Sequence, residues 1–195
     1  MAWEDVTVSL YPTRRVLTPW VPGLKPTDKQ SVPVADAAAK LDTDLMLEGL
    51  DQVDLCGLSY GAIVATRLAA DFPERVRRLV LIAGLVRPPG ALMKLQLWML
   101  KRMPAQRLAD SGVSKERLVN TLEIVRNVDL TDALPRITVP TLVLVGAKDK
   151  PNHPGARALA AGIPGAELRE VPGAGHQVNV ENPGELVEIL TDFLG

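Results

Sequence analysis

The sequence predicts an α/β fold in which a mostly parallel sheet is flanked by helices. An apolar run beginning at Val53 leads into a helical segment that ends at Phe72, and a second buried-strand run follows at 79–84. Strand, helix, strand is the unit that builds a parallel sheet. Two more strand runs, 141–146 and 168–171, lie on either side of another helical segment. This alternation predicts one α/β domain.

Length and composition limit the class of protein. The chain has 195 residues, 47% of them hydrophobic, which is enough for a single domain over residues 1–195 with a sizeable core. Its 22 basic and 23 acidic residues give a formal net charge of −1, which points to neither a nucleic-acid nor a membrane partner. The single cysteine, Cys56, allows no intramolecular disulfide. No stretch reads as a secretory signal or a membrane span, so we expect a cytoplasmic protein.

The N-terminal residues 1–16 carry two competing patterns. Trp3, Val6 and Leu10 are spaced for one face of a helix, whereas Val6, Val8 and Leu10 alternate as in a strand. We favour a short helix for this segment.

The next part of the chain predicts a strand, a loop and a helix. Residues 15–19 read as a strand that ends in the Pro22-Gly23 turn. Residues 24–33 are polar and contain two prolines, so they predict a loop. Between 34 and 47 the apolar residues recur at helical spacing with charged residues between them, which predicts an amphipathic helix.

The turn that follows the strand at Val53 carries the most specific motif. Gly57-Leu58-Ser59-Tyr60-Gly61 matches G-x-S-x-G, in which the glycines let the backbone fold sharply and present a serine hydroxyl above the next helix. With a strand before it and a helix after it, this turn resembles the nucleophile elbow of the α/β-hydrolase fold. Cys56, beside the elbow, is interpreted as a small buried strand residue and not as a catalytic thiol.

Residues 87–134 interrupt the alternation of strands and helices. After Pro88-Pro89-Gly90, the segment 92–103 is crowded with apolar side chains and holds three of the five methionines. Because methionine adapts to irregular shapes, this helix is either a core helix or a flexible apolar lid. A second helix is predicted at about 114–128. In α/β-hydrolases, helices inserted at this place commonly form a cap, so the resemblance implies that 87–134 is a small helical cap.

The C-terminal part returns to alternating strands and helices. The strand at 141–146 stops at a glycine, and a helix over 154–162 separates it from the strand at 168–171. A Gly-x-Gly-His loop follows. Asn182 as a cap and Pro183 at the first position predict the start of the closing helix. Its predicted buried face carries Leu186, Ile189, Leu190 and Phe193.

A serine hydroxyl is a poor nucleophile at neutral pH and needs a base to take its proton. The chain offers two histidines. His176 lies in the loop after a strand, where a parallel sheet would place it at the same edge as Ser59. His153 lies in a polar loop and is expected to face solvent. His176 is therefore the predicted base.

The base in turn needs an acid that fixes its tautomer. Asp149 follows a buried strand through a short turn, and Ser, Asp, His is the chain order that the α/β-hydrolase fold uses. Asp129 and Asp132 are weaker candidates because they precede that strand. A zinc or manganese site fits poorly, since Asp149 and His153 would form a lone pair of ligands. No glycine-rich nucleotide fingerprint is present, so no cofactor is expected.

The resemblance to α/β-hydrolases covers roughly residues 15–195 and implies a role for each motif. Ser59 would be the nucleophile, His176 the general base and then acid, and Asp149 the orienting carboxylate. The backbone N–H of Tyr60 would supply one oxyanion donor. The serine argues against the haloalkane dehalogenase and epoxide hydrolase branches, which use an aspartate there.

The sequence also departs from the family pattern. Upstream of the strand predicted at 15–19, α/β-hydrolases usually carry further strands and a His-Gly loop that gives the second oxyanion donor, and this chain has neither. One central strand would then be missing. Val6–Tyr11 could fill its place, another subunit could do so in a homodimer, or the chain lacks an N-terminal part.

These features predict a serine hydrolase. Its small-molecule substrate would be an ester, lactone or thioester with an apolar group, cleaved through an acyl-enzyme intermediate. Two alternatives stay open: acyl transfer on the same scaffold, and a non-catalytic binding protein that lacks a complete oxyanion hole.

Overall fold

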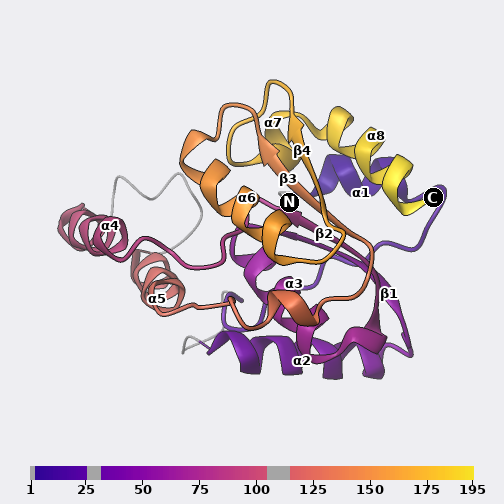
Figure 1. Ribbon diagram of the computed structural model, residues 1–195, viewed down its shortest axis with the longest axis horizontal. Helices are drawn as coiled ribbons and strands as arrows, with labels where there is room; N and C mark the ends of the chain where they lie inside the picture. Colours follow the sequence, from indigo (N-terminus) through magenta and orange to yellow (C-terminus); the bar gives the residue numbers. More distant parts are fainter. Residues whose placement is uncertain (1–2, 26–31, 105–114) are drawn as a thin grey trace.

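The computed structural model describes residues 3–25, 32–104 and 115–195. Its centre is a parallel four-stranded sheet in the order β1-β2-β3-β4 (Figure 1). The strands are β1 Val53–Leu58, β2 Val76–Ile82, β3 Thr141–Gly146 and β4 Glu167–Val171. All neighbouring pairs run parallel, so the predicted fold class is confirmed.

Two apolar clusters sandwich the sheet because its central strands are buried on both faces. In β2, Leu79 and Leu81 belong to one cluster, and Val80 and Ile82 belong to the other. This is the period of two expected for side chains along a strand. The result is a three-layer α/β/α arrangement.

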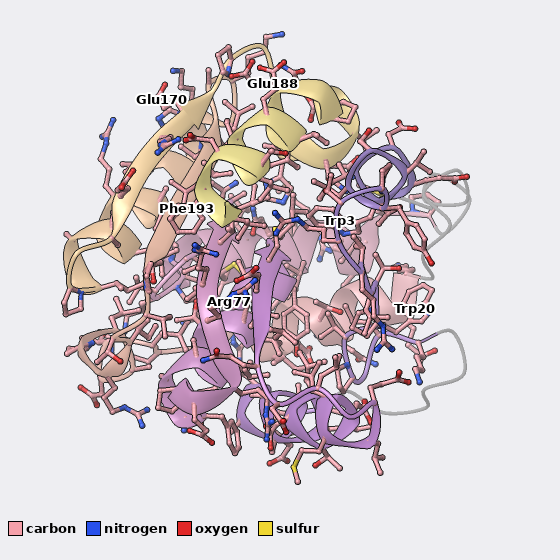
Figure 2. The ribbon with its side chains drawn as sticks, turned by 90° about the vertical axis from the view of Figure 1, so that its right-hand side faces the viewer. Trp3, Trp20, Arg77, Glu170, Glu188 and Phe193 are labelled. Atoms are coloured by element: carbon pink, nitrogen blue, oxygen red, sulfur yellow. The ribbon has the colours of Figure 1, made fainter. Side chains whose placement is uncertain are left out.

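Each cluster is closed by its own set of helices. The first is covered by α2 Val34–Leu47, α3 Tyr60–Asp71 and α6 His153–Gly162. The second is covered by α1 Glu4–Leu10, α7 Val178–Glu181 and α8 Pro183–Leu194. Helices α1 and α8 lie side by side (Figure 1), and Trp3 and Phe193, labelled in Figure 2, pack against the second cluster. Single 3₁₀ turns occupy Pro73–Arg75, Leu134–Arg136 and Lys150–Asn152.

Two further helices, α4 Gly90–Arg102 and α5 Lys115–Arg126, lie between β2 and β3 in sequence. They pack against each other to one side of the sheet (Figure 1). Met93 and Leu97 of α4 are buried, whereas Leu95 and Trp98 are exposed. The apolar helix predicted at 92–103 therefore exists, and its Met93 belongs to the first of the two core clusters.

The strand predicted at 15–19 is wrong. Residues 15–21 have no regular secondary structure, and Leu17 and Trp20 are exposed. β1 is an edge strand of the described sheet and pairs there only with β2. Within the described ranges, therefore, no further strand lies on the other side of β1. A strand is stabilised by hydrogen bonds to a neighbouring strand, and in the described part of the chain residues 15–19 pair with none.

The helix favoured near the N-terminus is confirmed as α1, whose Val6 and Leu10 are buried. The hypothesis that Val6–Tyr11 supplies a central strand is therefore wrong. The helices predicted at 34–47 and after Asn182 are confirmed, and the Asn182 side chain accepts a hydrogen bond from the Glu185 N–H as a cap. In the described part of the chain, no helix is both long and apolar enough to span a membrane.

Candidate active site

Ser59 lies at the turn between β1 and α3 with a backbone φ of 54°. This left-handed conformation is costly for a residue with a side chain, and it projects the hydroxyl away from the sheet. The Ser59 N–H donates to the carbonyl oxygen of Ile82 at 2.8 Å, which ties the turn to the end of β2. A Cβ atom on Gly57 would lie 2.4 Å from the Gly61 oxygen, so this tight turn requires glycine there.

Asp149 follows β3 in a turn closed by its own N–H, which donates to the Gly146 oxygen at 2.9 Å. Its side chain is only 6% exposed. The Asn152 side-chain amide donates to Oδ1 of Asp149 at 2.8 Å and to Oδ2 at 2.9 Å. The carboxylate is thus held in a buried position by a neutral donor.

His176 lies in the loop after β4 and joins the other two side chains. Its Nδ1 is 2.9 Å from Asp149 Oδ2, and its Nε2 is 3.1 Å from Ser59 Oγ. With Asp149 ionised, Nδ1 carries the proton, which leaves Nε2 free to accept the Ser59 hydroxyl proton. The structure therefore brings together the three side chains that the sequence singled out.

The loops after β3 and β4 approach each other closely enough to allow these distances. A Cβ on Gly146 would lie 2.1 Å from the Gly175 oxygen, so only glycine at this position lets the loops meet. The Lys148 N–H donates to the Ala174 oxygen at 2.9 Å, which fastens one loop to the other. Asp149 and His176 are positioned by this backbone contact.

Glu181 supports the histidine loop and was missed by sequence reasoning. Its Oε2 accepts from the Gly175 N–H at 2.8 Å and its Oε1 accepts from the Gln177 N–H at 3.0 Å. The carboxylate therefore holds the amides on both sides of His176. Glu181 ends α7, a four-residue helix that was not predicted because one turn is too short for a periodic pattern.

The expectation that His153 faces solvent is wrong, because this histidine is only 6% exposed. It is the first residue of α6, where its Nε2 lies 3.1 Å from the Gly146 oxygen. Its Nδ1 is 3.5 Å from Oε1 of Glu170. The polar residues around it in sequence did not reveal that the helix packs behind the end of β3.

The remaining acidic candidates and the cysteine have other surroundings. Asp129 accepts hydrogen bonds from Thr131 and Arg87, and the Thr131 bonds in particular lower the pKa of its carboxyl. Asp132 is exposed. Cys56 is partly exposed as a residue, but its thiol is buried, and this burial raises the pKa of the thiol to about 12. A thiol that stays protonated at neutral pH is a poor nucleophile.

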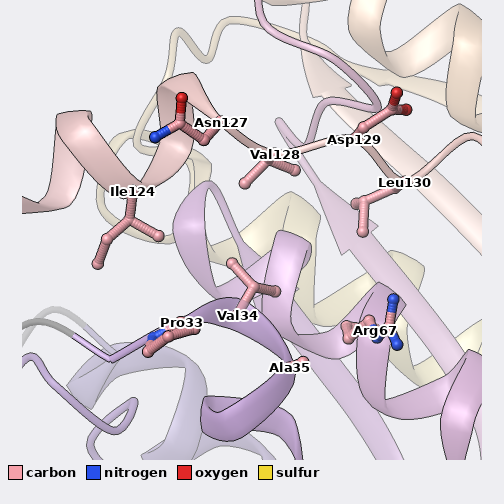
Figure 3. Close-up of a pocket in the computed structure, with 9 residues that line it drawn as sticks. All are labelled: Pro33, Val34, Ala35, Arg67, Ile124, Asn127, Val128, Asp129 and Leu130. Carbon is pink, nitrogen blue, oxygen red and sulfur yellow. The ribbon is translucent and has the colours of Figure 1, made fainter.

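A cavity of about 380 Å³ lies elsewhere, between the start of α2, the middle of α3 and the end of α5 (Figure 3). Ser59, Asp149 and His176 are absent from its lining, so it is separate from the candidate active site. Among the described residues, no group of three or more acidic, histidine or cysteine side chains is arranged to hold a metal ion.

The sequence profile described as the Alpha/beta hydrolase family matches residues 2–189. The chain belongs to the alpha/beta hydrolase family. Membership of this family explains why the serine, the aspartate and the histidine follow the strands β1, β3 and β4 in the chain order that the fold uses. The resemblance expected from the elbow motif is confirmed.

Relatives within the family show what this chain resembles. It is 28% identical to a Klebsiella pneumoniae protein assigned as carbamate hydrolase RutD, covering 83% of this chain and 73% of the relative. It is 27% identical to pyrrolizixenacetamide deacetylase of Xenorhabdus hominickii, covering 88% and 76%. A hydrolase from Pseudomonas aeruginosa PA01 superposes with a TM-score of 0.87 at 25% identity, covering 99% of this chain and 84% of that structure.

Proposed function

We propose that this chain is a serine hydrolase that cleaves an ester, lactone or thioester through an acyl-enzyme intermediate at Ser59. The observation that carries the proposal is the relay of hydrogen bonds from Ser59 through His176 to Asp149. A hydroxyl, an imidazole and a carboxylate in this order form an activated nucleophile.

The first half of the reaction forms the acyl-enzyme. Ser59 Oγ attacks the substrate carbonyl carbon while His176 Nε2 takes the hydroxyl proton, and Asp149 stabilises the resulting imidazolium. His176 then gives this proton to the departing alcohol or thiol. In the second half, His176 removes a proton from water, the hydroxide attacks the acyl carbon, and the returned proton releases Ser59 with the free acid.

The oxyanion that develops during attack needs hydrogen-bond donors. Tyr60 begins α3, and the first N–H groups of a helix have no partner inside the helix. The Tyr60 backbone N–H therefore serves as one donor, and the positive end of the helix dipole adds to it. Loss of a single oxyanion donor typically costs about 10² to 10³ in rate.

The substrate class is supported by what the relatives are named for. The names include carbamate hydrolase and deacetylase among sequence relatives, and enol-lactonase and esterase among proteins of similar fold. All of these reactions begin with attack on an acyl carbon. The apolar helix α4, which exposes Leu95, Trp98 and Met99, supports a substrate with an apolar group and a cap role for residues 87–134.

Labelling with a serine-directed fluorophosphonate, read by intact mass, tests this function. We expect one adduct on the wild-type protein and none on Ser59→Ala or His176→Ala, with circular dichroism showing that all three are folded. Folded wild-type protein without an adduct would favour the non-catalytic binding alternative. If the adduct forms, esters of graded acyl length report the apolar preference, and added alcohols separate hydrolysis from acyl transfer by the products formed.

A further inference from the structure

Asn152 contacts two of the side chains in the relay. Its Nδ2 lies 2.8 and 2.9 Å from the two oxygens of Asp149 and 3.1 Å from His176 Nδ1. The residue closes the 3₁₀ turn that begins at Lys150, and its own N–H donates to the Asp149 carbonyl oxygen at 3.0 Å. Main chain and side chain of Asn152 therefore both bind Asp149.

We infer that Asn152 is a positioning residue for the hydrolysis proposed above, and that its amide holds the Asp149 carboxylate against His176. The catalytic part of this inference rests on the proposed function. The positional part rests only on the hydrogen bonds that Asn152 makes to Asp149.

A buried carboxylate stays ionised only if donors replace the water that it loses. His176 Nδ1 supplies one donor, and the Asn152 amide, with two hydrogens, reaches both oxygens. Lys148 and Lys150, which flank Asp149 in sequence, are both exposed. Among the described residues, a neutral amide therefore stabilises the ionised carboxylate of Asp149, as a cation would in an ion pair.

The neutrality of this donor matters for the reaction. During attack His176 becomes an imidazolium, and the negative charge of Asp149 stabilises it. A cation at the place of Asn152 would offset that charge and repel the imidazolium. An amide satisfies the carboxylate and leaves its charge available.

The orientation of the amide also controls the proton on His176. Reversing the amide would place Asn152 Oδ1 beside the carboxylate, where two acceptors repel, and beside Nδ1, whose proton it would draw away from Asp149. The carboxylate selects the orientation in which Nδ2 donates. Helix capping does not explain this side chain, because Asn152 is the N-cap of α6 but makes no side-chain cap hydrogen bond.

The test replaces Asn152 by aspartate and by leucine. Both variants have a similar size. Leucine cannot donate to Asp149, and aspartate cannot donate while it is ionised. Asn152→Asp adds a negative charge beside His176, so we expect the pKa of His176 to rise by about one unit or more. Asn152→Leu leaves Asp149 short of a donor, so we expect a smaller rise. In both, fluorophosphonate labelling at neutral pH should slow by at least about tenfold.

The pKa is measured by NMR titration of the imidazole carbon-bound protons, which needs no activity. The chain has two histidines, so His176→Ala assigns the signals and His153 serves as an internal control. Asn127→Asp makes the same charge change at a residue whose amide donates to the Glu123 carbonyl oxygen instead. This variant should leave the pKa of His176 and the labelling rate unchanged.

The outcomes separate the two proposals. An unchanged His176 titration in both folded Asn152 variants, or a labelling rate equal to wild type, would overturn the positioning role. A raised pKa of His176 in a protein whose wild type does not label would keep the geometric role and reject the hydrolase. If Asn152→Asp does not fold, Asn152→Leu decides the matter with the same two measurements.

Discussion

At the scale of single residues, the candidate site depends on groups held in environments that are costly to build. Ser59 has a strained backbone, which costs on the order of 1–3 kcal/mol and which the hydrogen bond to Ile82 helps to hold. Asp149 is a buried carboxylate whose two oxygens are occupied by Asn152 and His176. The Ile82 carbonyl holds the strained serine turn, and the donors on Asn152 and His176 replace the water that the buried carboxylate has lost.

Cys56 gives a pH-dependent prediction at this scale. Burial raises the pKa of its thiol from an ordinary value of 9.0 to about 12, so the folded state keeps the proton that the unfolded state loses. The stability that Cys56 contributes is therefore complete below pH 9.0 and is lost as the pH rises toward about 12. Urea unfolding at pH 8 and pH 10.5 should show a larger fall in unfolding free energy for wild type than for Cys56→Ala. Equal falls in the two proteins would contradict the burial of the thiol.

At the scale of elements, the site is made by the ends of strands. Ser59 follows β1, Asp149 follows β3 and His176 follows β4, so all three lie at the carboxyl edge of the parallel sheet. The short helix α7 separates the histidine loop from α8, and the side chain of Asn182 connects the start of this loop to the start of α8. Its Nδ2 donates to the Pro172 oxygen at 2.8 Å while its Oδ1 caps α8.

Asn182→Ala tests this connection. Loss of the cap should lower the free energy of unfolding by about 1 kcal/mol. Because Pro172 also loses its donor, labelling at Ser59 should become slower as the histidine loop loosens. Thr191→Ala, an exposed change in the same helix, is the control: it should leave the labelling rate unchanged and should not lower the free energy of unfolding, because alanine is the better helix former. A stability equal to wild type in Asn182→Ala would show that the cap contributes nothing.

At the scale of the whole molecule, the two clusters on either side of the sheet hold the site in place. Leu81 is fully buried in the first cluster, whereas Leu95 on α4 is exposed. Leu81→Ala should therefore lower the free energy of unfolding by about 2–5 kcal/mol, through lost burial and the cavity that remains. Leu95→Ala should change it by less than about 0.5 kcal/mol. Denaturant unfolding of both variants checks this, and similar losses would mean that α4 is part of the folding core.

Much of the fold was predictable because its signals are local. The apolar runs of β1 and β3, the periodicity of α2 and the cap of α8 are each contained in a few neighbouring residues. The segment 15–19 shows where this fails. Its apolar pattern suits a strand, but a strand forms only beside another strand, and local sequence does not record whether that neighbour is present.

The three relay residues were also predictable, because a motif, a scarce residue type and a chain order limited the choice to Ser59, His176 and Asp149. By itself, the sequence determined the four strands of the sheet, the longer helices between them and the chemical identities of these groups, since each depends on neighbours along the chain. Only the tertiary structure decided that His153 is buried, that Glu181 holds the amides beside His176 and that Asn152 binds Asp149. A hydrogen bond between loops forms only when the donor–acceptor distance is correct to within a few tenths of an ångström. The packing of the helices and strands that carry the loops sets that distance.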